Sequence, residues 1–464
     1  MREKIAVVLA AGEGKRMMSK KPKVLCEVLF KPMLSWVLSA CEQASLQGVC
    51  VVAGYEHEQL EDYLQKKYGE RYPVVLQTER KGTGHAVMMA ERFLKEHPDS
   101  DMLLLCGDAP FIDGETIDAA YAYHCEHENS VTVVTAQLKD PTGYGRILRS
   151  EDGISGIVEQ KDATEEQRRI QEVNSGMYWF KTADLLEVLG ELTNNNVQGE
   201  YYITDTVALL LNKGKRAGAY LAADADVCLG ANDRKGLLQL NRIAAERILE
   251  KHLANGVGFV STDGVLIGPD VTIGPGSVIL PGSILRGSTQ VGAGCEIGPN
   301  TLLENARVGD ETILNSVQAY DCVIHDHVKM GPFVHIRPNS EILSGVKIGD
   351  FVEVKNSTIG EKTAVAHLTY VGDSDVGSNV NFGCGVVTVN YDGAKKHRTV
   401  IGDNAFIGCN TNLVAPVKIG NTAYTGAGST ITKDVPDGAL AVERGKTAII
   451  EGYAYKKLKD RIKK

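Results

Sequence analysis

Small and positively charged residues follow the first apolar segment of the chain. The segment Ile5–Leu9 runs directly into a loop, Ala10–Met17, that contains two glycines and Arg16, and Lys23 follows shortly after it. Small residues let backbone N–H groups approach phosphate oxygens, and the two side chains add positive charge. The loop is neither a Walker phosphate loop nor a GxGxxG dinucleotide fingerprint. Taken alone, it is equally compatible with a phosphate site and with a plain glycine-rich turn.

Further polar residues stand where later apolar segments end. Gln77 ends the third segment, and Gly82 and Thr83 follow in a turn of small residues that can lie flat against a nucleobase. Asp108 follows the fourth segment. A lone carboxylate at such a position is often a helix cap. Beside a phosphate loop, Asp108 is better explained as a ligand of Mg²⁺, which takes few carboxylates plus substrate phosphates.

Histidines in the second half of the chain raise two separate possibilities. His325 and His327 could share one strand face and bind a metal ion, but no third ligand is evident, so solvated histidines are favoured. His367 lies in the segment Ala366–Gly372, which also contains Tyr370. A lone histidine is usually structural, although imidazole is also suited to general-base catalysis.

The elements that must position the first group of residues are apolar segments separated by helical patterns. Besides Ile5–Leu9, we expect strands at Val49–Ala53, Val74–Gln77, Met102–Cys106 and Val131–Ala136. Strands that alternate with helices predict a mostly parallel α/β sheet, of the Rossmann-like kind, with ligand sites at the carboxyl ends of the strands. The phosphate loop, Gln77 and Asp108 would then meet at one edge of the sheet.

The second half of the chain repeats an apolar residue at every sixth position. One register runs from Ile267 through Ile273 and Ile279 to Leu303, and another runs from Ile401 to Ile431. A period of six fits neither a helix nor a single amphipathic strand, but it is typical of a parallel β-helix built from hexapeptide repeats. The pattern loosens over 314–342 and is interrupted again at 385–399, and loops that interrupt a solenoid usually serve its binding surface.

A helical pattern at 232–255 separates the two halves. We take this helix as an arm between domains, and an oligomerisation helix is the alternative. The predicted organisation is an α/β domain at 1–230, a helical linker at 231–256, a β-helix at 257–441 and a C-terminal tail at 442–464.

Composition narrows the class of protein. The net charge of −9 argues against a general nucleic-acid binder. The ten cysteines form no CxxC pair or disulfide-like framework, which suits a reducing cytoplasm. No apolar run has the length of a membrane span, and the chain opens directly into a strand-like segment. We therefore expect a cytoplasmic protein with no signal peptide and no membrane partner.

Several motifs together resemble one enzyme family. Leu9–Met17, Pro22–Leu25 and Gly107-Asp108 are similar to sugar nucleotidyltransferases, and Pro141–Ile147, Val158–Asp162 and Asn174–Met177 narrow the match. With hexapeptide repeats behind them, the chain to about Arg444 resembles the bifunctional N-acetylglucosamine-1-phosphate uridyltransferase/glucosamine-1-phosphate acetyltransferase family. The resemblance implies Mg²⁺ as cofactor, UTP and acetyl-CoA as co-substrates, and a left-handed β-helix that assembles as a homotrimer.

The resemblance also implies roles for residues of the first domain. Arg16 and Lys23 would hold phosphates, and Asp108 and Asn232 would share Mg²⁺. The other implied nucleotide-sugar contacts are Leu9, Ala10, Ala11 and Gly12 in the loop, Gln77, Gly82 and Thr83 at uracil, and Gly143, Glu159 and Asn174 at the N-acetylglucosamine unit. Lys15 is a departure, because the family more often has a small hydroxyl residue there.

In the β-helix, the resemblance makes His367 the catalytic base of acetyl transfer. The implied sugar-phosphate site consists of Arg337, Lys355, Tyr370 and Asn381, together with Asn390 and Tyr391, which are also assigned to acetyl-CoA. Cys384, Cys409, Ala427 and Arg444 would line the acetyl-CoA side. The two cysteines are departures from small non-thiol residues. An acyl-cysteine intermediate is an alternative to packed thiols, which are favoured.

The predicted function is therefore synthesis of UDP-N-acetylglucosamine in two steps. Glucosamine 1-phosphate would be acetylated first, and the product would then attack the α-phosphorus of UTP and release pyrophosphate. The loop Asn390–Arg398 is expected to reach a neighbouring subunit. Two other classes remain, namely a nucleotidyltransferase whose β-helix only oligomerises or regulates, and a non-enzymatic assembly module.

Overall fold

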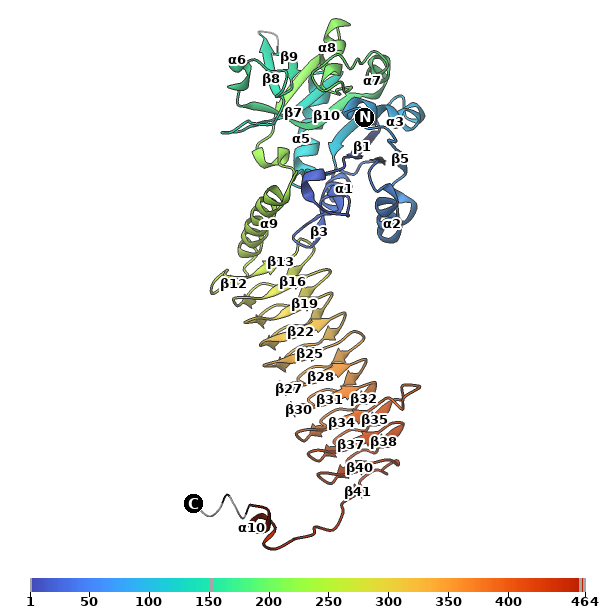
Figure 1. The fold of residues 1–464 in the computed structure, drawn as a ribbon, viewed down its shortest axis with the longest axis vertical. Helices are drawn as coiled ribbons and strands as arrows, with labels where there is room; N and C mark the ends of the chain where they lie inside the picture. Colours follow the sequence, from blue (N-terminus) through green and yellow to red (C-terminus); the bar gives the residue numbers. More distant parts are fainter. Residues whose placement is uncertain (1, 151–152, 459–460, 462–464) are drawn as a thin grey trace. The chain divides into compact units, whose positions relative to one another are not determined.

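The computed structural model describes residues 2–150, 153–458 and 461. The chain divides into two compact units, Met1–Glu246 and Arg247–Lys464 (Figure 1). Helix α9 (Arg234–Ala254) crosses this division, close to the predicted helix at 232–255. The N–H of Gly236 donates to Asp233 Oδ1 at 2.8 Å and so caps its first turn. The finer division into four segments remains a prediction.

The first unit is built on one mixed sheet. The order of its strands is β11-β7-β10-β6-β1-β4-β5, and β8 pairs with β9 and β10. The pairs β1–β4, β1–β6 and β4–β5 are parallel, whereas β10 is antiparallel to both β6 and β7. The strands of this sheet are β1 (Lys4–Ala10), β4 (Gly48–Ala53), β5 (Val74–Leu76), β6 (Asp101–Cys106), β7 (Val131–Gln137), β8 (Arg146–Ser150), β9 (Gly153–Val158), β10 (Glu172–Lys181) and β11 (Ala217–Leu221). Two short strands, β2 (Glu27–Val28) and β3 (Lys31–Pro32), pair with each other in a separate sheet.

Helices cover both faces of this sheet. Side chains alternate along β1, so Ala6 and Val8 face one core, with α1 and α5, while Ile5 and Val7 face another, with α3 and α7. Both faces are buried, and this explains why the strands read as continuous apolar runs. The helices are α1 (Met33–Gln43), α2 (His57–Tyr68), α3 (Thr83–Met89), α4 (Glu91–Glu96), α5 (Gly114–Glu126), α6 (Glu165–Arg168), α7 (Thr182–Leu189) and α8 (Asp205–Asn212).

The second unit is a parallel β-helix, as the six-residue period predicts, and its left hand is the one that the family resemblance implies. Three parallel sheets form its sides, and successive strands of one sheet are typically 18 residues apart, as in the pairing of Leu266 with Ile284. Sheet I contains β12 (Gly258–Phe259), β15 (Val278–Ile279), β18 (Glu296–Ile297), β21 (Ile313–Leu314), β24 (Lys329–Met330), β27 (Lys347–Asp350), β30 (Ala364–His367), β33 (Asn381–Phe382), β36 (Phe406–Ile407), β39 (Tyr424–Thr425) and β41 (Leu440–Ala441).

The other two sides have the same construction. Sheet II contains β13 (Leu266–Ile267), β16 (Ile284–Arg286), β19 (Leu302–Glu304), β22 (Val317–Tyr320), β25 (Val334–Ile336), β28 (Glu353–Lys355), β31 (Tyr370–Gly372), β34 (Val387–Val389), β37 (Asn412–Val414) and β40 (Thr430–Ile431). Sheet III contains β14 (Thr272–Ile273), β17 (Gln290–Val291), β20 (Arg307–Val308), β23 (Val323–Ile324), β26 (Glu341–Ile342), β29 (Thr358–Ile359), β32 (Ser374–Val376), β35 (Thr399–Ile401) and β38 (Val417–Ile419).

Most strands turn an apolar side chain into the prism. In sheet I these include Ile279, Ile297 and Leu314, and none of the three has exposed side-chain surface. They stack on the equivalent residue of the next coil, so each coil buries its apolar surface mainly against its neighbours. Buried hydroxyls at corners bond to the next coil, as Ser277 Oγ does to the carbonyl oxygen of Gly292 at 2.8 Å.

One coil is much longer than the others. Ser374 of β32 pairs with Thr399 of β35, 25 positions later, because the segment 389–398 is inserted before β35. A short helix, α10 (Tyr453–Lys457), lies near the end of the described chain. In the described ranges, no helix has the length and apolar character needed to cross a bilayer.

Candidate functional site

A pocket of about 330 Å³ lies at the carboxyl ends of β1 and β6. Eight of the predicted nucleotide or metal residues line it, namely Leu9, Ala11, Gly12, Lys23, Gln77, Gly82, Thr83 and Asp108. The structure thus brings together three segments that are far apart in the sequence, as expected for the carboxyl edge of a parallel sheet.

Two oxygen groups in this region converge on one cation. Lys23 Nζ forms an ion pair with Asp108 Oδ2, and it donates to Asn232 Oδ1 at 3.1 Å. The segment that carries Asn232 comes close because Gly230 packs against Asp108, where an added Cβ would lie 3.1 Å from the Asp108 carbonyl oxygen. A carboxylate and an amide oxygen are ligands that hard divalent cations prefer. The donor set therefore fits a divalent metal ion, which would compete with the Lys23 ammonium for these oxygens.

The uracil candidates are held by a rigid turn. Gln77 is buried, and its Nε2 donates to the carbonyl oxygen of Gly82 at 3.1 Å. Gly82 has a φ of +100°, and a Cβ there would lie 2.6 Å from the carbonyl oxygen of Tyr201. Thr83 Oγ1 accepts from the N–H of Ile203 at 3.2 Å. Only glycine fits at position 82, and this fixes the small-residue turn that the sequence indicated.

The candidate sugar residues form a neighbouring group. The N–H of Asn174 donates to the carbonyl oxygen of Gly145 at 2.9 Å, and a Cβ at Gly145 would lie 3.4 Å from Glu159 Oε1. Burial raises the pKa of Glu159, and the carboxylates of Asp162 and Asp205 raise it further. A bulge in β10 after Asn174 packs against Cys106, which lines the nucleotide pocket.

Other predicted residues lie outside the pocket lining. Ala10 is buried in β1, Gly143 lies in a turn with a φ of +92°, and Arg16 is exposed on a short 3-10 turn, Lys15–Met17.

The pocket also contains Arg80, which the sequence reasoning missed. Arg80 forms an ion pair with Glu13 of the phosphate loop, and its hydrogen bond is the main cause of a lowered pKa at Glu13. The sequence did offer one signal for Arg80, because this cation stands two residues before Gly82 in the predicted nucleotide-binding turn.

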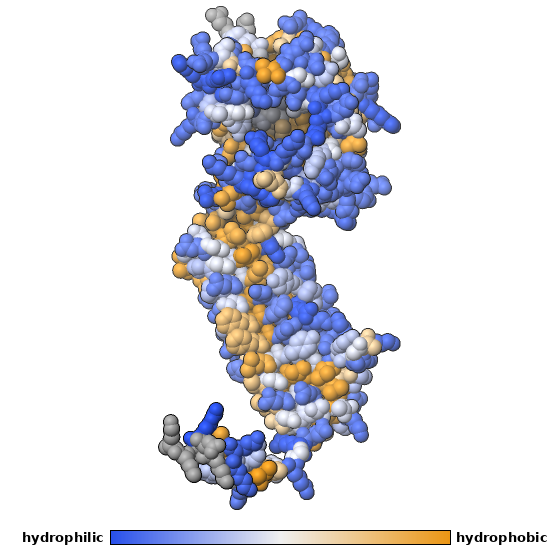
Figure 2. All heavy atoms as spheres, in the orientation of Figure 1, coloured by the Kyte–Doolittle hydropathy of each residue, from blue (hydrophilic) through white to orange (hydrophobic). Residues whose placement is uncertain are grey.

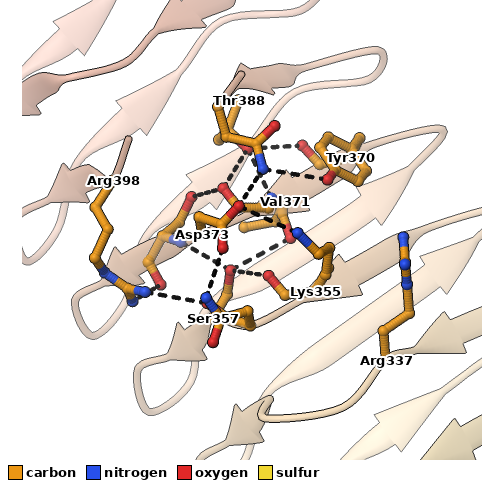
Figure 3. Close-up of polar contacts among 12 residues, drawn as sticks. Arg337, Lys355, Ser357, Tyr370, Val371, Asp373, Thr388 and Arg398 are labelled. Atoms are coloured by element: carbon orange, nitrogen blue, oxygen red, sulfur yellow. Dashed lines mark hydrogen bonds and ion pairs between the residues drawn. The ribbon is translucent and has the colours of Figure 1, made fainter. Parts of the chain in front are cut away.

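In the β-helix, several candidates surround one buried carboxylate, Asp373 (Figure 3). Asp373 follows β31 and is 4% exposed. Its Oδ2 pairs with Lys355 Nζ at 3.3 Å and accepts from Asn390 Nδ2, while Asn356 Nδ2 donates to Oδ1 at 2.5 Å. Burial alone would raise the pKa of Asp373, but these three donors outweigh it and hold the pKa below its usual range. An ionised Asp373 therefore orients both Lys355 and Asn390.

Arg337 and Tyr370 lie on the same side of the prism. Arg337 directly follows β25, and the register that pairs Ile336 with Val354 places it beside Lys355 of the next coil. Asn390 Nδ2 donates to Tyr370 Oη at 3.4 Å. The Tyr370 ring can lie along its strand because residue 372 is glycine, where a Cβ would collide with the phenol oxygen.

Lys396 is a further residue of this group that the sequence reasoning did not single out. It lies in the inserted segment, and the neighbouring Lys355 ammonium is the main cause of a lowered pKa at Lys396, to which Arg337 also contributes. Three cationic side chains therefore gather here, with Lys355 paired to Asp373 and Arg337 Nη1 paired to Glu353 Oε1 at 2.9 Å. Such a group of cations suits a dianionic phosphate. Two consecutive lysines in the polar loop were the only sequence signal.

His367 and the candidate acetyl-CoA residues share one corner of the prism. His367 ends β30 and is exposed. The N–H of Gly385 donates to the carbonyl oxygen of His367 at 3.3 Å, that of Asn410 to Cys384 at 2.7 Å and that of Gly428 to Cys409 at 2.7 Å. These repeated bonds place His367, Cys384, Cys409 and Ala427 at equivalent positions of successive coils. A Cβ at Gly426, beside Ala427, would lie 3.0 Å from the Arg444 guanidinium.

Two further candidates of the β-helix are exposed or bonded within their own loop, and the contacts of His325 and His327 agree with the favoured interpretation of surface histidines. Asn381 is exposed on sheet I, and Tyr391 donates to Gly393 within its own loop at 2.6 Å. His325 and His327 do not converge, because Nε2 of His325 binds Glu341 at 2.9 Å and Nδ1 of His327 lies 3.2 Å from Glu311. Across the described part of the chain, no three or more His, Cys, Asp or Glu side chains are grouped to hold a metal ion.

Comparison with known proteins gives consistent matches for both units. A family model described as nucleotidyl transferase matches residues 5–230, and one described as bacterial transferase hexapeptide (six repeats) matches 270–305 and 398–433. The chain is 48% identical over 454 residues to the "Bifunctional protein GlmU" of Acetivibrio thermocellus, covering 98% of this chain and 97% of that protein. The proteins of the same name from Caldanaerobacter subterraneus and Clostridioides difficile are 48% and 43% identical, over 99% and 97% of this chain and 99% and 97% of their own lengths.

Proposed function

The chain belongs to the family of bifunctional GlmU proteins, and we propose that it makes UDP-N-acetylglucosamine by acetyl transfer followed by uridylyl transfer. The observation that carries this proposal is the presence of two separate polar sites. One lies at the carboxyl edge of the sheet in the first unit, and the other lies on the β-helix around Asp373. A β-helix that served only as a scaffold would need no such cluster of cations.

In the acetyl-transfer site, His367 takes the proton from the amine of glucosamine 1-phosphate as this amine attacks the thioester of acetyl-CoA. Arg337, Lys355 and Lys396 hold the phosphate. Asp373 positions Lys355 and Asn390 through the contacts of its Oδ2 atom with both side chains. Tyr370, which begins the strand after the one that His367 ends, contacts the sugar, and Asn381 and Tyr391 complete its pocket. The acetyl-CoA side follows the corner that carries Cys384, Cys409 and Ala427 towards Arg444.

In the uridylyl-transfer site, the phosphate of N-acetylglucosamine 1-phosphate attacks the α-phosphorus of UTP, and pyrophosphate leaves. Gln77, Gly82 and Thr83 hold uracil, and Gly143, Glu159 and Asn174 hold the sugar. Arg16 and Lys23 neutralise phosphate charge and align the reacting groups.

A nucleotidyltransferase of this family implies a divalent metal ion, and we propose Mg²⁺ held by Asp108 and Asn232. When bound, the ion would neutralise charge on the phosphates. Lys23, which pairs with both residues in the structure, would then be released to the phosphates.

We also propose a homotrimer formed through the β-helix. Apolar side chains are exposed in consecutive coils at one corner, where Phe333 and Phe351 are each more than half exposed and stack with ring centroids 5.2 Å apart. Leu368, beside His367, is 58% exposed and continues this ridge. Figure 2 shows apolar residues gathered along the face of the β-helix in view. An exposed apolar ridge of this kind is typical of an interface between protein chains, and it supports the proposed trimer. The protein should then sediment as a particle with three times the mass of one chain.

We place the protein in the cytoplasm. All ten cysteines are free thiols, and a reducing compartment suits them.

The full-length protein tests the proposed function directly. CoA thiol release from acetyl-CoA should depend on glucosamine 1-phosphate, and pyrophosphate release from UTP should depend on N-acetylglucosamine 1-phosphate and a divalent metal ion. Pyrophosphate release without any CoA release would leave a nucleotidyltransferase with a scaffold β-helix. Neither release would favour a non-enzymatic assembly module.

A Lys355→Met variant tests the phosphate cluster. Loss of one charge-assisted hydrogen bond, about 1.5–3 kcal/mol, should raise the KM for glucosamine 1-phosphate about 10- to 100-fold. Lys347→Met is the matched control, because Lys347 is an exposed lysine on sheet I and should leave this KM unchanged. Equal KM values in the two variants would remove Lys355 from the proposed site.

A further inference from the structure

Two cysteines stand directly above one another at the corner that carries His367. Phe382 pairs in register with Ile407, and Cys384 and Cys409 follow these residues by two positions each. The N–H of Asn410 donates to the carbonyl oxygen of Cys384 at 2.7 Å, which fixes the register of the two corners. Both are free thiols, and neither is buried.

The spacing of coils allows these two thiols to join. Residues in register on adjacent parallel strands lie about 4.8 Å apart, and a disulfide spans a Cα–Cα distance of about 4.4–6.8 Å. The other cysteines of the β-helix, Cys295 and Cys322, are buried, and burial raises the pKa of Cys322 to about 12. Those two are therefore inert thiols, while Cys384 and Cys409 form an accessible pair.

A histidine occupies the position before Cys384 in the same column of the prism. The N–H of Gly385, the residue after Cys384, donates to the carbonyl oxygen of His367. His367 therefore precedes Cys384 in the same column, one coil away, as Cys409 follows it. A thiol becomes a nucleophile when a neighbouring base takes its proton. Cys384 is thus the thiol placed to react first, and Cys409 is placed to resolve the product.

We infer that Cys384 and Cys409 form a thiol–disulfide exchange site for disulfides that carry a CoA group, and that closing the Cys384–Cys409 disulfide stops acetyl transfer. The inference rests on the proposed function, because it uses the acetyl-CoA site at this corner to recognise the CoA group. Ala427 and Arg444 continue the same corner, so the binding contacts and the reactive thiols belong to one surface. A disulfide across the corner would lie on the surface that the thioester must reach beside His367, and its closure should therefore stop acetyl transfer.

The reaction is balanced with CoA disulfide as the oxidant. Cys384 gives its proton to His367, and its thiolate attacks one sulfur of CoA disulfide, which breaks the S–S bond. The first CoA leaves as a thiol with the proton that His367 held. Cys409 then attacks the Cys384 sulfur, gives up its own proton, and releases the second CoA thiol. Two cysteine thiols are oxidised by two electrons, and CoA disulfide is reduced to two CoA thiols.

The test incubates the reduced full-length protein with CoA disulfide in the absence of oxygen. We expect the protein to become lighter by two hydrogens, a cross-linked peptide that contains Cys384 and Cys409, and acetyl transfer reduced at least tenfold. Dithiothreitol should reverse all three changes. Uridylyl transfer should persist, because its site lies in the other unit. Glutathione disulfide at the same concentration should react more slowly, since it lacks the CoA group.

Three variants sharpen the test. Cys409→Ala should stop at a mixed disulfide and gain the mass of one CoA on Cys384. Cys384→Ala should form no internal cross-link, and each variant is compared with its own reduced form. Cys125→Ser removes an exposed cysteine of the first unit and should react as the unaltered protein does. Alanine is a suitable replacement because the same corner carries Ala427 one coil further on.

The outcomes separate this inference from the proposed function. If the reduced protein acetylates glucosamine 1-phosphate but CoA disulfide forms no Cys384–Cys409 link, the inference is wrong. The inference is also wrong if the link forms and acetyl transfer continues at its full rate. If the reduced protein does not acetylate at all, the proposed function is contradicted instead.

Discussion

Replacing His367 by alanine should lower the rate of acetyl transfer about 10²–10⁴-fold, the range that general-base catalysis contributes. The amine must lose a proton as it attacks the thioester, and His367 provides an imidazole at the end of β30, one coil before Cys384 at the same corner. Because His367 is exposed, its removal should not unfold the β-helix. The measurement is CoA thiol release with glucosamine 1-phosphate at saturating substrate.

Two controls give this result its meaning. UTP-dependent pyrophosphate release by the same variant should be unchanged, because that site lies in the other unit. His325→Ala removes another histidine of the β-helix, one that binds Glu341 at a different corner, and acetyl transfer should survive it. A His367→Ala protein with an undiminished rate would show that the proton leaves by another path.

The six-residue period predicted the β-helix because each side of a coil needs one inward apolar residue. The prediction is confirmed by Ile279, Ile297 and Leu314, which stack without exposure. In the first unit, the parallel strands around β1 were also predicted from apolar runs. Neither the strand β10 nor its antiparallel direction was predicted, and a strand buried on both faces has no periodicity that tells its direction.

The candidate sites were predictable only where a residue stands on a regular element or in a known motif. The six-residue period predicts the strand that carries Lys355. It does not show that Asp373 is buried, ionised and in contact with both Lys355 and Asn390. Lys396 was not predicted for a related reason. Its position near Lys355 depends on the conformation of the inserted loop, which the period does not describe. Arg80 depends on a loop–loop ion pair with Glu13, which no local pattern encodes.

Replacing Asp108 by asparagine should lower kcat/KM for uridylyl transfer about 10²–10³-fold. The exchange preserves size and removes one charge from the pair of oxygens that hold Lys23. A metal ion contributes several kcal/mol of charge stabilisation in such reactions, and each 1.36 kcal/mol corresponds to a factor of ten in rate. The measurement is pyrophosphate release as a function of Mg²⁺ concentration, and the half-saturating concentration should rise.

The same variant separates loss of a metal ligand from loss of structure. Asp118→Asn is the matched control, since Asp118 is an exposed carboxylate whose surface ion pair with Lys4 is worth little. Acetyl transfer by both variants should remain unchanged. If Asp108→Asn kept its full rate and its Mg²⁺ dependence, the carboxylate would only anchor Lys23, and the metal ion would have to find its ligands among the phosphates and Asn232. A rate that falls while the half-saturating Mg²⁺ concentration stays constant would likewise assign Asp108 to Lys23. A fall in rate together with a higher half-saturating Mg²⁺ concentration is the result that places the cation between Asp108 and Asn232.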